Sequence, residues 1–208
     1  MIAAVEGPSA AGKSTWASGV ASNVIEEYRP SDAEPDPDDA QAVSRYWVEA
    51  NAARWAAAVD LESKSGIAMC DGEPLKLHYD WCMAAIGASS WDRFEQAYSY
   101  SKDAMSKRRL GFADVIFTIF PDDLTLQSRR DGDLTRTRRN FGLHLQLAAP
   151  LQHWYGTLAD LDPGRVTDVL PSSLSEINAS PRPSPNRFDT RLLDALVGQL
   201  GRPNTSQA

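Results

Sequence analysis

The stretch that decides the fold reads Gly7-Pro8-Ser9-Ala10-Ala11-Gly12-Lys13-Ser14. It matches the pattern GxxxxGK(S/T), in which two glycines permit a tight turn whose backbone amides can surround phosphate groups. An apolar run from Ile2 to Val5 precedes it, and a segment rich in Ala and Ser follows it. A strand, a glycine turn and a helix in this order predict a phosphate-binding loop (P-loop) at the N-terminus of the helix.

Two side chains of this loop carry the expected chemistry. Lys13 is a compact cation that should reach the β- and γ-phosphates of ATP, and the Ser14 hydroxyl should bind Mg²⁺. Lys13 is therefore a candidate catalytic residue. The candidate nucleotide-binding residues of the loop are Gly7, Pro8, Ser9, Ala10, Ala11, Gly12, Lys13, Ser14 and Thr15.

Further apolar runs alternate with helical segments along the chain. Strands are expected at 2–6, 66–70, 113–120 and 165–170, and residues 24–28 suit a strand or a helix equally well. Helices are expected from Lys13, over 38–63 and 90–110, from Pro121, and over 143–161 and 188–200. Loops are expected at 31–39 and 181–185 because both are rich in proline. This alternation predicts an α/β fold with a parallel sheet that helices cover on both faces.

Length and composition narrow the class of protein. A chain of 208 residues suits one domain, expected over 1–200, with a flexible tail at 201–208. A net charge of −7 and a pI near 5.0 argue against a nucleic-acid-binding surface. Any phosphate site must therefore be built from local positive charge.

Cysteine usage and the N-terminus indicate the compartment. Cys70 and Cys82 belong to no CxxC or Cys/His array, so both are expected to be reduced, buried thiols. Met1 leads directly into a short apolar run with no basic flank and no stretch long enough to span a bilayer. We expect a cytoplasmic protein without a membrane partner. The three histidines, at 78, 144 and 153, lack metal-ligand spacing and are taken as structural.

The stretch from Val5 to Thr15 resembles the P-loop of thymidylate kinases and deoxynucleoside kinases, in which a glutamate and a glycine follow the strand, as Glu6 and Gly7 do here. The resemblance implies a P-loop kinase that uses ATP and Mg²⁺ and phosphorylates a hydroxyl or phosphate of a nucleoside-like small molecule. Asp71 stands where those kinases carry an acid followed by an arginine. Here Gly72 and Glu73 follow it instead, which leaves nucleoside specificity open.

An arginine-dense segment resembles the lid of the same kinases. Residues 129–139 follow an expected strand and helix, and the lid is predicted over about 127–142. Guanidinium groups that close over the transferred phosphate would stabilise its charge and exclude water. Arg129 and Arg136 are the candidate catalytic arginines, and Arg130 is a candidate nucleotide-binding residue. A solvated basic helix face is the alternative.

Asp71 is the first candidate for the catalytic acid or base. A carboxylate at a strand end beside the P-loop can organise Mg²⁺ together with Ser14, or accept a proton from the acceptor. Glu27 and Glu34 are rival bases, because the resembled kinases can carry the base after their second strand. An ordinary Asp-Gly turn is the alternative for Asp71.

The resemblance also places an acceptor pocket on the long expected helix and after the strand that ends near Cys70. The rings and charges there could hold a flat or polar acceptor, although core packing explains most tryptophans. The candidate substrate-binding residues are Glu27, Arg45, Trp47, Arg54, Glu73 and Lys76.

Two other functions stay open at this level. One is an antibiotic or secondary-metabolite O-phosphotransferase with the same phosphate machinery and a different acceptor cleft. The other is a nucleotide-dependent switch ATPase, which the arginine-rich segment and the short chain disfavour. The sequence leaves open the acceptor, the choice between ATP and GTP, and whether the chain forms a homodimer.

Overall fold

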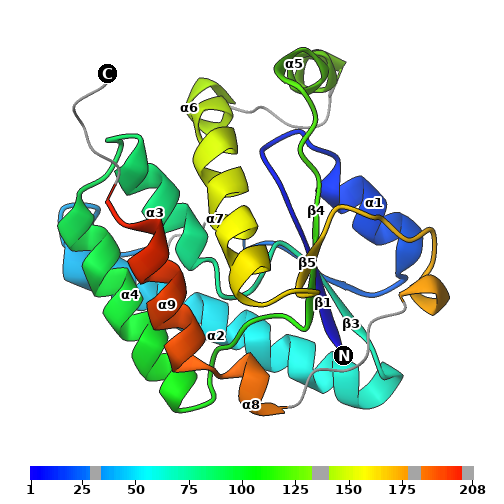
Figure 1. Cartoon of the computed structure of the whole chain (residues 1–208), viewed down its shortest axis with the longest axis horizontal. Helices are drawn as coiled ribbons and strands as arrows, with labels where there is room; N and C mark the ends of the chain where they lie inside the picture. The colour runs from blue at the N-terminus through cyan, green and yellow to red at the C-terminus, as the bar shows by residue number, and fades with distance from the viewer. Residues whose placement is uncertain (29–33, 133–140, 178–183, 203–208) are drawn as a thin grey trace.

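A computed structural model describes residues 1–28, 34–132, 141–177 and 184–202. Its sheet has five parallel strands in the order β2-β3-β1-β4-β5 (Figure 1). The strands are β1 (Ile2–Glu6), β2 (Val24–Ile25), β3 (Ala68–Asp71), β4 (Val115–Thr118) and β5 (Val166–Thr167). All five lie in segments where the sequence favours or permits a strand.

Helices make up most of the remaining described structure. They are α1 (Lys13–Val20), α2 (Ala40–Ser65), α3 (Leu77–Ala85), α4 (Trp91–Ser106), α5 (Asp123–Gly132), α6 (Phe141–Gln146), α7 (Ala148–Leu161), α8 (Ser184–Arg187) and α9 (Thr190–Leu200), with a 3₁₀ turn, η1 (Leu174–Glu176). Figure 1 shows α1 on one side of the sheet and α2, α3, α4, α7 and α9 on the other.

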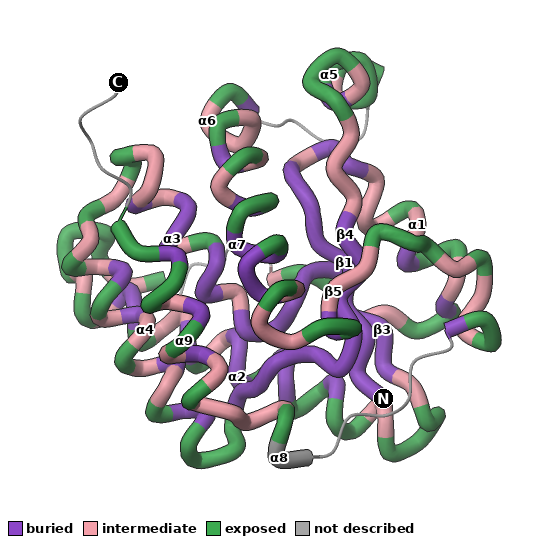
Figure 2. The backbone as a smooth tube through the Cα atoms, in the orientation of Figure 1, coloured by how far each residue is buried: buried purple, intermediate pink, exposed green. Residues whose placement is uncertain are grey.

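The central strand β1 is buried on both faces, and Figure 2 shows it as a continuous buried segment. Ile2 and Ala4 pack into the larger core with α2, α3, α4, α7 and α9. Ala3 and Val5 point to the opposite face and pack with α1 and the segment around Ile177. Burial on both faces explains why residues 2–5 of this strand are all apolar rather than alternating.

The long helix α2 has clear signals at both ends. The Asp39 carboxylate caps it by accepting a hydrogen bond of 2.9 Å from the backbone N–H of Ala42. It ends at Gly66, whose φ of 80° places it in the left-handed region that favours glycine. The expected helix at 38–63 is thus present with small shifts of its ends.

Several local expectations need correction. The segment 143–161 forms two helices, because Pro150 lies in the first turn of α7 and has no N–H to continue α6. Helix α3 lies in a segment to which the sequence analysis assigned no helix. Of the expected loop at 181–185, the first three residues lie outside the described residues and the last two belong to α8.

Cys70 and Cys82 are both free and buried, as the sequence predicts. No helix among the described residues is long and apolar enough to cross a membrane.

Candidate active site

The P-loop joins β1 to α1 with the left-handed backbone that its sequence permits. Gly7 and Gly12 have φ values of 153° and 97°, and Ala10 has a φ of 68°. A Cβ atom on Gly7 would lie 2.2 Å from the backbone oxygen of Ile119, at the end of β4. Only glycine fits this close approach of two chain segments. Leu126 of α5 and Phe141 of α6 pack behind the loop at Ala10 and Ala11.

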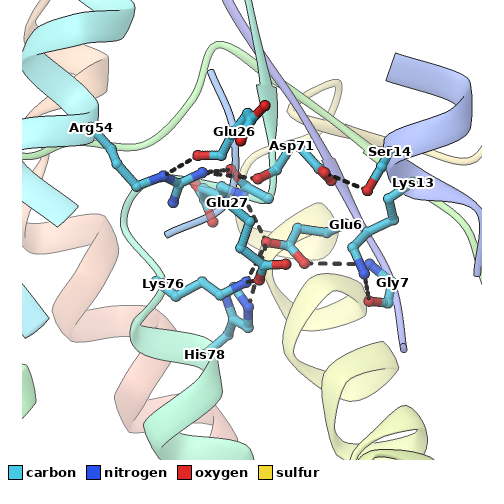
Figure 3. A network of polar contacts seen from close by, with 12 residues as sticks. Glu6, Gly7, Lys13, Ser14, Glu26, Glu27, Arg54, Asp71, Lys76 and His78 are labelled. Carbon is cyan, nitrogen blue, oxygen red and sulfur yellow. Dashed lines mark hydrogen bonds and ion pairs between the residues drawn. The ribbon is translucent and has the colours of Figure 1, made fainter. Parts of the chain in front are cut away.

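Lys13 folds back over the loop in this structure. Its Nζ donates hydrogen bonds to the backbone oxygens of Gly7 (2.7 Å) and Pro8 (3.1 Å) (Figure 3). Burial lowers the pKa of Lys13, while the negative charge of Glu6 opposes that change. The ammonium group is therefore already at the loop, where bound phosphates would replace its neutral carbonyl partners.

Ser14 and Asp71 meet at the end of β3. The Ser14 hydroxyl donates a hydrogen bond of 2.6 Å to Oδ2 of Asp71. The other carboxylate oxygen, Oδ1, is buried and has no hydrogen-bond partner among the described residues. An unpartnered carboxylate oxygen beside a hydroxyl fits the oxygen ligands that Mg²⁺ prefers. No group of three or more His, Cys, Asp or Glu that could hold a metal occurs in the described part of the chain.

The two arginines at the end of α5 have different surroundings. Arg129 Nη1 donates a hydrogen bond of 2.5 Å to the backbone oxygen of Ala11 in the P-loop. Arg130 pairs with Asp131 and lies over the ring of Phe141, with its guanidinium carbon 4.7 Å from the ring centroid. Arg136 lies outside the described residues, as does half of the expected lid (133–140). Of the described arginines of this segment, Arg129 is therefore the one placed at the P-loop.

One cavity of about 1420 Å³ connects the P-loop to the expected acceptor side. Every residue from Gly7 to Thr15 lines it, as do Arg129 and, after β5, Leu170. On the acceptor side the wall includes four of the candidate substrate-binding residues, Glu27, Trp47, Arg54 and Lys76. The structure thus brings the predicted nucleotide side and much of the predicted acceptor side into one space.

Glu27 and Lys76 form an ion pair on the acceptor side, with Glu27 Oε1 2.5 Å from Lys76 Nζ. The charge of Lys76 lowers the pKa of Glu27 to about 2. Burial alone would lower the pKa of Lys76, but Glu27 and Glu6 together raise it above its usual range. Both side chains are therefore charged at neutral pH.

Arg54 lies in α2 and binds the backbone at the ends of β2 and β3. Its guanidinium donates hydrogen bonds to the backbone oxygens of Glu26 (3.0 Å), Asp71 (2.9 Å) and Gly72 (2.9 Å). Its Nη1 is buried without a hydrogen-bond partner among the described residues. The positive charge thus meets neutral carbonyl groups and leaves one nitrogen able to donate to a ligand.

Two candidate substrate-binding residues lie away from this cavity. Arg45 is exposed on the far side of α2, with its guanidinium carbon 5.6 Å from the ring centroid of Tyr100 in α4. Helical phase explains the difference, because Arg45 and Arg54 are nine residues apart, which is about two and a half turns. Glu73 is fully buried and does not line the cavity. Its carboxylate accepts from the Ala113 N–H (3.3 Å) instead.

The three candidate bases occupy different places. Asp71 is bonded to Ser14 on the nucleotide side and is not part of the cavity wall. Glu27 and Glu34 are both exposed and both line the cavity, and Glu27 is paired with Lys76.

Three residues at the site were not identified from the sequence as functional. Glu6 is a buried carboxylate at the end of β1, and His78 lines the cavity beside it, with Nε2 3.5 Å from Glu6 Oε1. Tyr155 of α7 contacts His78 from behind, 3.0 Å from Nδ1. The sequence does contain a signal for Glu6, which is an acid at the end of an otherwise apolar buried strand. No local sequence pattern predicts the contacts that His78 in α3 and Tyr155 in α7 make.

Comparison with known proteins establishes the fold. No protein-family model matches the chain, and no curated protein sequence matches it. The structure is similar to that of a deoxyadenosine kinase from M. mycoides, solved with bound dATP, with a TM-score of 0.53 and 13% sequence identity. The match covers 80% of this chain and 89% of that one. This likeness confirms the predicted fold class, a parallel α/β sheet of the P-loop kinase type.

Proposed function

We propose that this chain is an ATP-dependent kinase that transfers the γ-phosphate to a hydroxyl or phosphate of a nucleoside-like small molecule. The observation that carries the proposal is the single cavity. Its wall combines the P-loop with charged and aromatic residues on the far side, so a phosphate donor and an acceptor can share one space. A protein that only bound nucleotide would not need the acceptor side of the cavity.

The P-loop side would bind the phosphates of ATP. The backbone N–H groups of the P-loop, which Pro8 lacks, and the N-terminus of α1 supply positive potential, and the Lys13 ammonium supplies a full charge. Ser14 and Asp71 would hold Mg²⁺. Neutralisation of phosphate charge is the chemistry that this ion supplies when bound.

The acceptor side would orient the attacking oxygen. Glu27 lines the cavity as an ionised carboxylate and can accept a hydrogen bond, and finally the proton, from the acceptor hydroxyl. Its low pKa makes it a weak base, so orientation is its larger contribution. Phosphoryl transfer through a loose transition state needs little help from a strong base. Arg54 Nη1 can donate to the acceptor from the same wall.

Arg129 would stabilise charge on the transferred group. Its bond to the Ala11 oxygen holds the guanidinium over the P-loop, and it lines the cavity. A guanidinium in this position can stabilise the equatorial phosphate oxygens as charge develops on them.

Acceptor-stimulated ADP formation tests the proposal. The protein with ATP and Mg²⁺ is screened against nucleosides, nucleoside monophosphates, sugars and aminoglycoside-like compounds, with Lys13→Ala as the catalytically impaired control. We expect at least one acceptor to increase ADP formation and to gain a phosphate that mass spectrometry detects. Transfer to an aminoglycoside-like compound alone would favour the antibiotic O-phosphotransferase. ATP hydrolysis that no acceptor stimulates would reject a kinase and favour a switch ATPase.

A further inference from the structure

Behind the P-loop, four buried side chains from separate parts of the fold form a continuous chain of polar contacts. Glu6 ends β1, Glu73 follows β3, His78 lies in the first turn of α3, and Tyr155 lies in α7. Glu6 and His78 line the cavity, whereas Glu73 and Tyr155 do not. Tyr155 therefore reaches the cavity indirectly, and His78 is the cavity-lining residue that its hydroxyl contacts.

Glu6 is an ionised carboxylate that is surrounded by hydrogen donors. The N–H of Glu73 donates to Oε1 (2.7 Å) and the N–H of Gly7 faces Oε2 (3.3 Å). Burial alone would raise the pKa of Glu6, but the positive charges around it, that of Lys76 first, lower it below its usual range. Lys76 Nζ lies 3.7 Å from Oε1, so Glu6 attracts the lysine that pairs with Glu27.

His78 faces this carboxylate with one nitrogen and Tyr155 with the other. Nε2 lies 3.5 Å from Glu6 Oε1, and Nδ1 lies 3.0 Å from the Tyr155 hydroxyl. Burial lowers the pKa of His78 to about 4, so the ring is neutral at neutral pH and carries one hydrogen. A lone pair on Nε2 would be repelled by the carboxylate, whereas an N–H there is attracted to it.

We propose that Tyr155 is a positioning residue for the acceptor side of the cavity: its hydroxyl donates to His78 Nδ1 and fixes the Nε2–H tautomer, which holds Glu6 in place. Glu6 in turn holds Lys76 beside Glu27. The link to acceptor binding rests on the proposed kinase function, while the tautomer itself does not. The Tyr155 hydroxyl has one hydrogen and two acceptors within reach, and its oxygen lies nearer to His78 Nδ1 (3.0 Å) than to Oε2 of Glu73 (3.2 Å). If the hydroxyl of Tyr155 instead donated to Glu73 and accepted from an N–H at Nδ1 of His78, the lone pair of Nε2 would face Glu6.

Nuclear magnetic resonance of the ring nitrogens tests the tautomer directly. In the ¹⁵N-labelled wild-type protein, long-range ¹H–¹⁵N correlations should show His78 protonated at Nε2 and unprotonated at Nδ1. Tyr155→Phe keeps the ring and removes the hydroxyl, so His78 should become a mixture of tautomers. Tyr98→Phe is the matched control, because it removes a hydroxyl that donates to Asp194, between α4 and α9, and should leave His78 unchanged.

Kinetics then test the positioning role with an acceptor identified by the screen. Tyr155→Phe should raise the acceptor KM by roughly fivefold to tenfold, about the effect of one neutral hydrogen bond, without a matching change in ATP affinity. His78→Gln places an amide N–H near the position of Nε2 and lacks Nδ1. In that background Tyr155→Phe should have no further effect on the acceptor KM.

Two results would overturn the proposal: a wild-type His78 protonated at Nδ1, or a His78 tautomer that Tyr155→Phe does not change. An acceptor KM that rises equally in Tyr155→Phe and Tyr98→Phe would reduce Tyr155 to a general structural role. If no acceptor is found, the kinase proposal fails separately, and the spectrum of the wild-type protein still decides the tautomer. The wild-type spectrum also suffices if Tyr155→Phe does not fold.

Discussion

The hydroxyl of Ser14 donates a hydrogen bond of 2.6 Å to Oδ2 of Asp71, and this bond joins the first turn of α1 to the last residue of β3. The two residues are 57 positions apart in the sequence. Parallel pairing of β1 with β3 places Asp71 opposite Val5, just before the P-loop. The sheet register is therefore what brings the predicted metal-binding pair together.

Asp71→Asn should reduce phosphoryl transfer much more than ATP binding. The amide keeps the shape and an oxygen for the Ser14 hydroxyl, but it loses the charge that would hold Mg²⁺. We expect single-turnover transfer to fall by about a hundredfold and the reaction to need more Mg²⁺. ATP affinity is measured by titration in parallel. Transfer within a few-fold of wild type would make Asp71 a turn residue, and an equal fall in both would place its main effect on nucleotide binding.

Arg129→Ala and Arg130→Ala separate a site arginine from its neighbour. Arg129 contacts the P-loop and lines the cavity, whereas Arg130 pairs with Asp131 and covers Phe141. We expect Arg129→Ala to lower kcat by about a hundredfold and Arg130→Ala to lower it by less than about fivefold. Similar losses in the two variants would mean that the segment contributes only general positive charge. The measurement is acceptor-dependent ADP formation at saturating ATP.

Gly7→Ala should destabilise the fold, and Gly19→Ala should not. A Cβ on Gly7 would meet the Ile119 oxygen at 2.2 Å in left-handed backbone, whereas a Cβ on Gly19 of α1 would meet nothing within 4 Å. We expect a loss of at least about 2 kcal/mol for Gly7→Ala and a gain of about 0.5 kcal/mol for Gly19→Ala. Urea unfolding measures both. An unchanged midpoint for Gly7→Ala would show that the loop relaxes without cost.

Glu62 lies away from the candidate active site and makes the stability of the protein depend on pH. It bonds bidentately to Arg187 (2.6 and 2.8 Å) and pairs with the N-terminal amine. These bonds to Arg187 lower the pKa of Glu62 from its ordinary 4.5 to about 2, against the effect of burial. A depressed pKa in the folded state stabilises the protein above pH 4.5, and this contribution is lost as the pH falls from about 4.5 toward 2.

Melting temperature measured across this range checks the prediction. Glu62→Gln should melt lower than wild type at pH 7, and its melting temperature should fall less steeply in acid. Asp60→Asn is the control on the same helix, because the ion pair of Asp60 with Lys64 is exposed. Parallel acid slopes for wild type and Glu62→Gln would contradict the assignment.

The sequence alone determined the P-loop and the fold class. The spacing of Gly7, Gly12 and Lys13 is local, and each residue type is required by backbone conformation or phosphate chemistry within a few residues. The apolar run before the loop is equally local. Strand β1 and the start of α1 therefore lie where the sequence places them.

In α2 the spacing of residues decides which side chains face the cavity. Trp47 and Arg54 are seven residues apart, nearly two full turns, and both line the cavity. Arg45 lies half a turn out of phase with Arg54 and contacts Tyr100 of α4 instead. Helical periodicity separates these residues once the helix is known.

Only the tertiary structure decided which distant groups meet at the site. Glu27 follows β2 and Lys76 precedes α3, and their pairing depends on the order and register of β2, β3 and β1. The contact of Tyr155 with His78 depends on the packing of α7 against α3. Such contacts join residues with no fixed spacing in the chain, because a sheet and its covering helices bring side chains together through three-dimensional packing rather than through a local sequence pattern.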